Sequence, residues 1–377
     1  MHLYRDIQDL IEKIALTAKE PGSASGVIGD VLEGKPVDAL PYIVRCPWGA
    51  VAPGTRYNLK EQFYDPEKML HAHLEEILRT CQSAHGAPLM LRPNFGTIFV
   101  PAAFGAGYDV LPDAYPWVTG HFSQEDIPRL EEADLLGSEM MQRALEYIRY
   151  FRSMLPEWIH VYQPDTQGPF DIAHLLLGND IFYLLLDDPD EAHRLMRIAT
   201  DGYCRITRAL KEALSEPEGE MYHGHALARG IYMRNGGTRV SEDTPTLLSP
   251  EMIDEFVLPY DEQALAQFGG GFIHFCGRHE YLLEKFAGMK GCRALNLGNP
   301  EMYDFDWVMR VIRENGCVYF GHWPRREGED ANAYIERMYA ASLGGKRHLL
   351  LHVNEDLFPG TSEEDFFSLW HRRAAAR

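Results

Sequence analysis

The sequence predicts an α/β fold, a single (β/α)8 barrel in which parallel strands alternate with helices. From residue 40 to the C-terminus, short apolar runs and amphipathic helical stretches alternate about seven or eight times. Repeating strand–helix units of this length imply a parallel sheet, and eight of them imply a closed barrel. No Pro-rich or charged linker divides the cycles, so residues 1–377 are expected to form one domain. A doubly wound open sheet is the competing fold, but no glycine-rich phosphate motif follows the first strand.

The expected elements follow from the spacing of apolar residues. Residues 1–40 are helical in pattern around a break at Pro21-Gly22-Ser23 and are expected to pack on the barrel as an N-terminal extension. Short apolar runs predict strands at 42–45, 89–92, 158–162, 230–233, 272–275, 292–297, 317–320 and 348–352. Apolar residues at helical spacing and capping residues predict helices at 66–83, 124–130, 137–155, 171–177, 189–214, after Ser249, and at 280–286, 304–315, 330–342 and 362–377. A glycine- and proline-punctuated loop at 104–117 is typical of a functional loop.

Charge and composition narrow the kinds of partner. The chain carries 56 acidic against 36 basic residues and a net charge of −20, which argues against nucleic acid or an anionic membrane as a partner. The N-terminus has no apolar signal segment and no run approaches about 18 apolar residues, so a soluble, cytoplasmic protein is expected. The six cysteines are scattered, unlike a disulfide framework, which fits a reducing compartment.

Polar side chains collect where the expected strands end. In (β/α)8 barrels the chemistry lies at the C-terminal face, on residues that follow the strands. The polar residues at these positions are Asn94, Asp165, Gln167, Asn235, His274, Cys276, Asn296, Asn299, His322, His352 and Glu355. One barrel mouth would collect all of them, which predicts a polar site there.

The most informative pair in this set is His274 and Cys276. Three glycines at 269–271 lead into an apolar strand that ends in this pair, and Gly277 suits the turn that follows. Residues two apart on a strand point to the same side, and a thiolate beside an imidazole suits zinc. Simple packing is the alternative, since cysteine is often buried and zinc needs three or four ligands. The other polar residues at the mouth favour a metal site.

Several stretches of the chain carry a family resemblance. They are 168–178 (GPFDIAHLLLG), 188–193 (DPDEAH), 247–252 (LLSPEM), 256–260 (FVLPY) and 273–277 (IHFCG), with support from 35–41 and 104–117. In this order they resemble the uroporphyrinogen decarboxylase superfamily over nearly the whole chain. The resemblance implies the same (β/α)8 barrel that the strand–helix alternation predicts.

The superfamily contains two main activities. One branch decarboxylates uroporphyrinogen without a cofactor, and the other uses zinc to move a methyl group from a methyl-corrinoid protein to a thiol, such as coenzyme M, or to a folate. The chain departs from the decarboxylase pattern at three places: the carboxylate-binding arginine motif is replaced near 46–49 (CPWG), the expected aspartate is Asn94, and the expected tyrosine is Leu175. An amide cannot supply the carboxylate that would stabilise pyrrole N–H groups. The resemblance therefore favours the methyltransferase branch.

The methyltransferase pattern is His-x-Cys with a later Cys at the end of the final strand. His274 and Cys276 match the first two positions. Asn354 stands at the third, with His352 and Glu355 close by. A zinc site of His274, Cys276 and His352 with one open position is a workable catalytic geometry, and these three are the predicted ligands.

The resemblance also implies a mechanism. Zinc would take an incoming thiol and lower its pKa, and the thiolate would attack a methyl group on a corrinoid held by a partner protein. Asp165, Gln167 and Asn94 would orient the acceptor, and Asp165 or Glu355 would hydrogen-bond the pterin of a tetrahydrofolate acceptor. The residues assigned to corrinoid binding are Asn296, His322 and Asn235. Such an enzyme would act within a demethylation system.

Other functions stay open. The chain could be a decarboxylase (a lyase), a non-catalytic barrel that binds a corrinoid or tetrapyrrole, or a metal-dependent demethylase. A homodimer stays open as an assembly. His223 and His225 repeat the two-apart spacing in a weak strand. Glu242-Asp243 are interpreted as helix caps or solvated loop charges.

Overall fold

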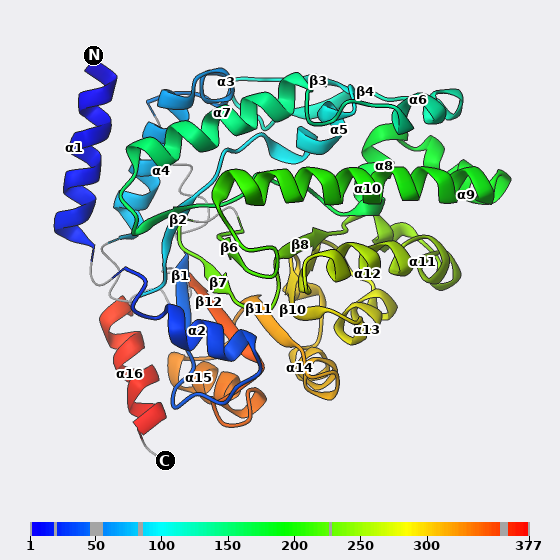
Figure 1. Cartoon of the computed structure of the whole chain (residues 1–377). Coiled ribbons are helices and arrows are strands. Elements are labelled where there is room, and N and C mark those ends of the chain that lie inside the picture. The colour runs from blue at the N-terminus through cyan, green and yellow to red at the C-terminus, as the bar shows by residue number, and fades with distance from the viewer. Residues whose placement is uncertain are drawn as a thin grey trace.

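The computed structural model of the chain describes residues 2–18, 21–45, 56–81, 86–225, 228–354 and 361–375. Within these ranges six parallel strands form one sheet, in the order β1 (Tyr42–Arg45), β12 (Leu349–Asn354), β11 (Val318–His322), β10 (Cys292–Leu297), β9 (Gly271–Phe275) and β8 (Thr238–Ser241). A second parallel pair is formed by β2 (Leu89–Leu91) and β5 (Ile159–Val161). Together they supply the eight strands of a (β/α)8 barrel, which Figure 1 shows at the centre of the molecule with helices around it.

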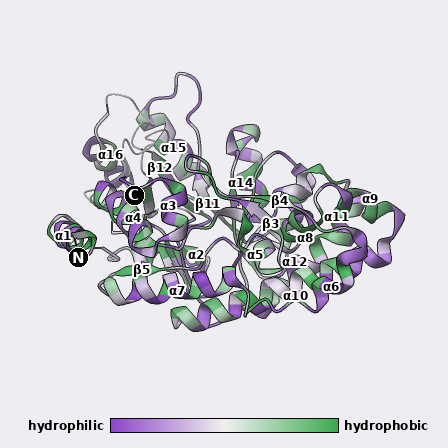
Figure 2. Cartoon of the chain, turned by 90° about the horizontal axis from the view of Figure 1, so that it is seen from above, coloured by the Kyte–Doolittle hydropathy of each residue, from purple (hydrophilic) through white to green (hydrophobic). Residues whose placement is uncertain are grey.

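Helices alternate with these strands along the chain. They are α1 (His2–Thr17), α2 (Ser25–Leu32), α3 (Leu59–Tyr64), α4 (Pro66–Thr80), α5 (Phe99–Ala103), α6 (Ile127–Glu131), α7 (Glu139–Met154), α8 (Pro169–Leu177), α9 (Asp180–Asp187), α10 (Pro189–Leu214), α11 (Pro250–Phe256), α12 (Leu258–Gln267), α13 (Glu280–Gly288), α14 (Phe305–Glu314), α15 (Ala331–Ala341) and α16 (Glu363–Ala375). Caps set their starts: Ser249 accepts the Met252 N–H at α11, and Asp188 accepts the Glu191 N–H at α10. Figure 2 shows that hydrophilic and hydrophobic residues alternate along the outer helices, as in amphipathic helices.

The region before β8 differs from the prediction. The run at 230–233 was expected to be a barrel strand, but β7 (Ile231–Met233) pairs antiparallel with β6 (Met221–His223) in a hairpin. The barrel strand is β8, which begins at residue 238, seven residues after the start of β7 at residue 231. Three residues of its sequence, Thr-Arg-Val-Ser, are polar, and two of them face a polar barrel mouth, so a search for apolar runs passes over it.

The predicted loop at 104–117 contains a small hairpin. β3 (Gly107–Asp109) pairs antiparallel with β4 (Trp117–Gly120), and Gly107 and Gly120 face each other. A Cβ on Gly107 would lie 3.2 Å from the Cα of Gly120, so the two chains approach closely because both residues lack side chains.

Alternation along the strands separates two cores. One side of each strand faces the helices, and the other side faces the barrel interior. The interior cluster includes Ile43, Phe272, Ala294, Phe320 and Leu350, and α2 covers it with Ile28 and Val31. Residues two positions further along these strands face the same interior, which places the polar side chains of His274, Asn296, His322 and His352 at its C-terminal end.

Within the described residues, no single helix is both long and apolar enough to cross a membrane. α8 and α9 reach that length and composition only when taken together, and they are bent by 107° at the break between them.

Candidate metal centre

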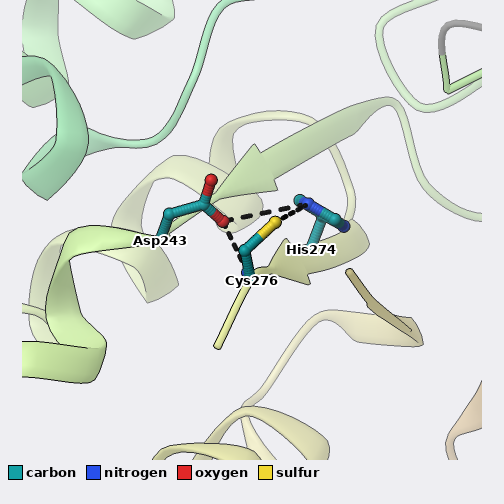
Figure 3. A group of neighbouring side chains, drawn as sticks. All are labelled: Asp243, His274 and Cys276. Atoms are coloured by element: carbon teal, nitrogen blue, oxygen red, sulfur yellow. Dashed lines mark hydrogen bonds and ion pairs between the residues drawn. The ribbon is translucent and has the colours of Figure 1, made fainter. Parts of the chain in front are cut away.

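The structure brings the predicted pair His274 and Cys276 together. His274 lies near the end of β9 and is buried, and Cys276 follows the strand and is partly exposed. The Cys276 Sγ lies 3.5 Å from the His274 Nε2 (Figure 3). Both side chains therefore point to one place at the C-terminal mouth of the barrel, as residues two apart on a strand do.

A third potential ligand, Asp243, completes the group. Its Oδ1 lies 3.8 Å from the His274 Nε2 and accepts the Cys276 backbone N–H at 2.6 Å. Among the described residues, one donor atom from each of Asp243, His274 and Cys276 lies within 4.8 Å of the others (Figure 3). Imidazole nitrogen, thiolate sulfur and carboxylate oxygen are the donor atoms that zinc takes in proteins, so we call these three residues the metal triad.

Asn296 fixes the orientation of the His274 ring. The Asn296 amide nitrogen donates to the Phe320 carbonyl, so its Oδ1 is left to accept from the His274 Nδ1 at 2.6 Å. Nδ1 therefore carries the proton, and the bare Nε2 faces the Cys276 thiol. Burial and the positive charge of Arg239 lower the pKa of His274 to about 4, which keeps the ring neutral, as a metal ligand must be.

The thiol of Cys276 is protonated at neutral pH. Burial, with the negative charge of Asp243 beside it, raises the pKa of Cys276 to about 12. A cation bound between the thiol and the carboxylate would reverse this effect, because it favours both negative charges. The donor set therefore fits a soft divalent cation such as zinc.

The position of Asp243 follows from alternation along β8. Arg239, Ser241 and Asp243 lie on one side of the strand and its extension, and Val240 and Glu242 lie on the other. The inner side faces the mouth, whereas Val240 packs in the core against the helices. The sequence signal for Asp243 was therefore its two-residue spacing from Arg239 and Ser241.

Behind the triad, carboxylates join α8 to the segment after β8. Glu242 accepts the N–H groups of Phe170 at 2.9 Å and Asp171 at 3.0 Å. Asp171 in turn accepts the N–H groups of Asp243 at 2.9 Å and Thr244 at 2.8 Å. The first turn of α8 and the Asp243 backbone thus hold each other. Glu242 is buried and caps the start of α8, one of the two roles predicted for this pair, whereas the Asp243 carboxylate is 44% exposed.

A third buried carboxyl, Asp261 on α12, contacts the same group. Burial, together with neighbouring carboxyls, raises the pKa of Asp171 to about 7 and that of Asp261 to about 8, and raises that of Glu242 well above its usual range. Glu242 and Asp261 shift each other's pKa, and neither carboxyl oxygen of Asp261 has a hydrogen-bond partner among the described residues. A proton on one of the two carboxyls would supply the missing donor, and the raised pKa values mean that this buried pair holds one at neutral pH.

Asp165 lies near the triad but in a separate group. It forms an ion pair with Arg239 at 2.7 Å and approaches Arg92 at 3.5 Å, and it accepts the Gln167 amide at 2.7 Å. Asn94 accepts the Gly96 N–H at 3.3 Å beside this group. Asp165 and Gln167 are thus held in a charged network at the mouth, and Asn94 lines the same small cavity as Arg92.

The remaining predicted residues fall in different places. His352 is buried against the Phe320 ring, with centroids 4.6 Å apart, and pairs in register with His322, but it is not part of the metal triad. Asn296 contacts His274 directly. Asn235 was expected at the mouth, which is wrong: it precedes β8, at the opposite end of the barrel, and donates to the Leu32 carbonyl. Glu355 lies outside the described residues.

His225 is a further neighbour of the site. Its ring centroid lies 4.4 Å from that of His274, and its φ of 46° is in the left-handed region. Burial, with the neighbouring His274 ring and the positive charge of Arg239, lowers the pKa of His225 well below the usual range, so this ring is neutral. The repeated two-residue spacing of His223 and His225 was the sequence signal for this position.

The fold and the metal triad define a (β/α)8 protein with its polar site at the C-terminal mouth. The sequence profile described as uroporphyrinogen decarboxylase (URO-D) matches residues 27–215, half of the chain, and the chain belongs to this family. The structure also resembles that of a methyltransferase from Methanosarcina mazei, with 18% sequence identity, a TM-score of 0.59, and coverage of 93% of this chain and 98% of that chain. No curated protein sequence matches the chain significantly. The family and the fold class predicted from the sequence are confirmed.

Proposed function

We propose that the chain is a zinc-dependent methyltransferase. It would move a methyl group between a corrinoid carried by a partner protein and a thiol or tetrahydrofolate acceptor, within a demethylation system. The observation that carries the proposal is the metal triad at the barrel mouth, in which the bare Nε2 of His274 faces the thiol of Cys276 at 3.5 Å. The fold shared with the Methanosarcina mazei methyltransferase agrees with it.

The chain's own residues would prepare the site in three ways. His274 is held neutral and in the tautomer that leaves Nε2 free to bind a metal. Asp243 places a carboxylate beside the thiol, an arrangement that favours a bound cation. Its side chain is 44% exposed, so molecules at the mouth can reach the triad. Zinc bound there would lower the pKa of a coordinated thiol so that a thiolate exists at neutral pH.

We propose Asp243 as the third ligand, with the predicted His352 as the alternative. Metal content of the purified protein, measured by mass spectrometry, tests both. We expect about one zinc per chain in the native protein, as for a single catalytic site. Cys276→Ala and Asp243→Asn should lose the metal, and His352→Ala should keep it. Loss in His352→Ala with retention in Asp243→Asn would restore the predicted ligand set.

A second cysteine serves as the matched control. Cys204 is a buried thiol on α10, away from the triad. Cys204→Ala should keep its zinc, which separates loss of a ligand from loss of any buried thiol. Absence of metal from all correctly folded proteins would remove the basis of the proposal.

Methyl transfer itself is measured with zinc-loaded protein, methylcobalamin and either 2-mercaptoethanesulfonate or tetrahydrofolate. The cobalamin absorbance reports loss of the methyl group. We expect a rate that falls by about 100-fold or more in Cys276→Ala, since removal of a metal ligand removes the activation of the acceptor. No transfer to either acceptor by zinc-loaded native protein would contradict the proposal.

Decarboxylation is the second candidate, and the family match favours it. Two positions argue against it. Asn94 stands where an aspartate that binds the pyrroles was expected, and Leu175, which is buried on α8, stands where a tyrosine was expected. Consumption of uroporphyrinogen by zinc-depleted protein would favour this second function.

A further inference from the structure

Two buried arginines share one carboxylate at the barrel mouth. Arg92 follows β2 and is 7% exposed, and Arg239 lies on β8 and is 5% exposed. Asp165 lies between them, 2.7 Å from the Arg239 Nη1 and 3.5 Å from the Arg92 Nη2. This group of three carries one net positive charge inside a chain whose net charge is −20. A buried charge without a counter-charge is unfavourable, so the group suits an anion.

On the Arg92 side, the titratable neighbours do little to offset this positive charge, whereas on the Arg239 side Asp243 supplies a further carboxylate. Burial lowers the pKa of His73 to about 4 and that of His223 well below the usual range, so both rings are neutral. Glu76 is the other carboxyl beside Arg92, and burial raises its pKa, which favours its neutral form. Asp165 is ionised, because Arg239 and Arg92 hold its pKa far below the usual range.

A small cavity adjoins Arg92. Its volume is about 100 Å³, and its polar walls are formed by Arg92, Asn94, Tyr115, Tyr162, His73 and Glu76. The Arg92 Nε, the Arg239 Nε and the His73 Nε2 are buried and have no hydrogen-bond partner among the described residues. The two Nε atoms belong to the guanidinium groups of Arg92 and Arg239, which stay protonated. Each Nε–H is therefore a donor that is available to an acceptor on a bound molecule.

The arginine pair and the metal triad share one strand. The Arg239 Nη2 donates to the Ser241 Oγ at 2.9 Å, and Ser241 pairs in register with His274. Asp243 follows on the same side of the chain two residues later. A small molecule bound to the arginines would therefore extend toward the triad.

We propose that Arg92 and Arg239 bind the carboxylate of a small organic acid. A guanidinium presents paired N–H donors in a plane, which match the two oxygens of a carboxylate. The acid would be the molecule that gives or accepts the methyl group at the triad, and in this role the inference rests on the proposed function. Carboxylate binding itself needs no metal.

The test is calorimetric titration of zinc-depleted, full-length protein with benzoate and acetate. Their neutral counterparts, benzamide and acetamide, have similar shapes without the charge, and inorganic phosphate is the competing anion. We expect at least one of the two acids to bind about tenfold or more tightly than its amide. Equal binding of acid and amide, binding of phosphate alone, or no binding of either acid would overturn the proposal.

Variants of opposite expected effect keep the test specific. Arg92→Gln should weaken binding of the acid about tenfold or more, whereas Asp165→Asn should strengthen it, because it removes the competing carboxylate. Arg208→Gln, at an exposed helical arginine, is the control and should change nothing. Arg92→Lys replaces Arg92→Gln if circular dichroism shows that the latter is unfolded. Weakening by Asp165→Asn as large as by Arg92→Gln would overturn the proposal, since it would indicate a merely structural role.

The two proposals fail separately. Acid binding without zinc and without methyl transfer leaves the carboxylate site standing and removes the methyltransferase. Zinc-dependent methyl transfer without acid binding removes the carboxylate site alone.

Discussion

The side chain of Asn296 decides which nitrogen of His274 faces the metal triad. Its Oδ1 holds the proton on Nδ1 through a 2.6 Å hydrogen bond. We predict that Asn296→Ala lowers zinc affinity by about 10- to 100-fold, because the ring loses the partner that fixes its tautomer. Competition with a chromophoric chelator measures the change. Asn315→Ala, at the C-cap of α14, is the control, and unchanged affinity in Asn296→Ala would mean that the ring is oriented by other contacts.

Gly298, after β10, leaves room for the Cys276 thiol. A Cβ on Gly298 would collide with the Cys276 Sγ. We predict that Gly298→Ala displaces the thiol and lowers zinc affinity about tenfold or more, although it removes no ligand. Gly219→Ala is the matched control, because a Cβ there meets no atom within 4 Å. Full zinc content and native affinity in Gly298→Ala would show that the thiol can move without loss.

Sequence alone could identify His274 and Cys276 because both lie on one recognisable strand and its exit. The only signal for Asp243 is its two-residue spacing from Arg239 and Ser241, and it is weak because the strand before Asp243 has polar residues at its interior-facing positions and does not resemble an apolar run. The arginine pair was missed for a different reason: Arg92 and Arg239 are 147 positions apart in the chain (92 to 239), and only the closed barrel brings them to one carboxylate.

At the scale of elements, the contact between α8, α12 and the β8 exit makes stability depend on pH. Asp171 and Asp261 have pKa values raised to about 7 and about 8, against 3.8 in an unfolded chain. Between about pH 4 and pH 8 the native state therefore holds protons that the unfolded state has already released. Stability should fall as pH rises through this window, by about 1.4 kcal/mol per pH unit for each proton held.

Asp261→Asn tests this dependence. The amide can donate to Glu242 without a shared proton, so the variant should lose part of the pH slope and exceed the native protein in stability above pH 8. Urea unfolding at pH 5, 7 and 9 measures the free energy of unfolding. Asp254→Asn, at an exposed carboxylate on α11, is the control. Parallel slopes in the native protein and Asp261→Asn would contradict the buried, shared proton.

The order of elements was largely predictable from the sequence, and their boundaries less so. Glycine turns and proline at N1 mark most strand–helix steps, and α10 and α11 begin where their caps predict. The hairpin of β6 and β7 was not predictable, because its short strands resemble those of the barrel and only their antiparallel pairing distinguishes them.

At the scale of the whole molecule, a metal at the triad would link two neighbouring strand exits. Asp243 follows β8, and His274 and Cys276 belong to β9 and its exit. We predict that zinc at about 100 times its dissociation constant raises the free energy of unfolding by about 2.7 kcal/mol, seen as a higher Tm. Magnesium should give no shift, since it avoids thiolate ligands. An equal shift with magnesium, or a zinc shift that persists in Cys276→Ala, would contradict binding at the triad.

The barrel itself was predictable from the number of strand–helix cycles. The family match and the similar solved structure confirm it. The single domain over residues 1–377, the corrinoid partner and the homodimer stay predictions. They concern boundaries and surfaces that depend on partners, for which periodicity along one chain carries no signal.

The exchange of hydrogen bonds between α8 and the β8 exit has a dynamic consequence. Glu242 holds the amides of residues 170 and 171, and Asp171 holds those of residues 243 and 244. If the start of α8 separated from the segment after β8, the carboxyls of Glu242 and Asp171 would both lose the N–H donors that they accept from. The four amide protons should therefore exchange with solvent together, in one opening event, and Asp243 can leave the mouth only when the start of α8 opens with it.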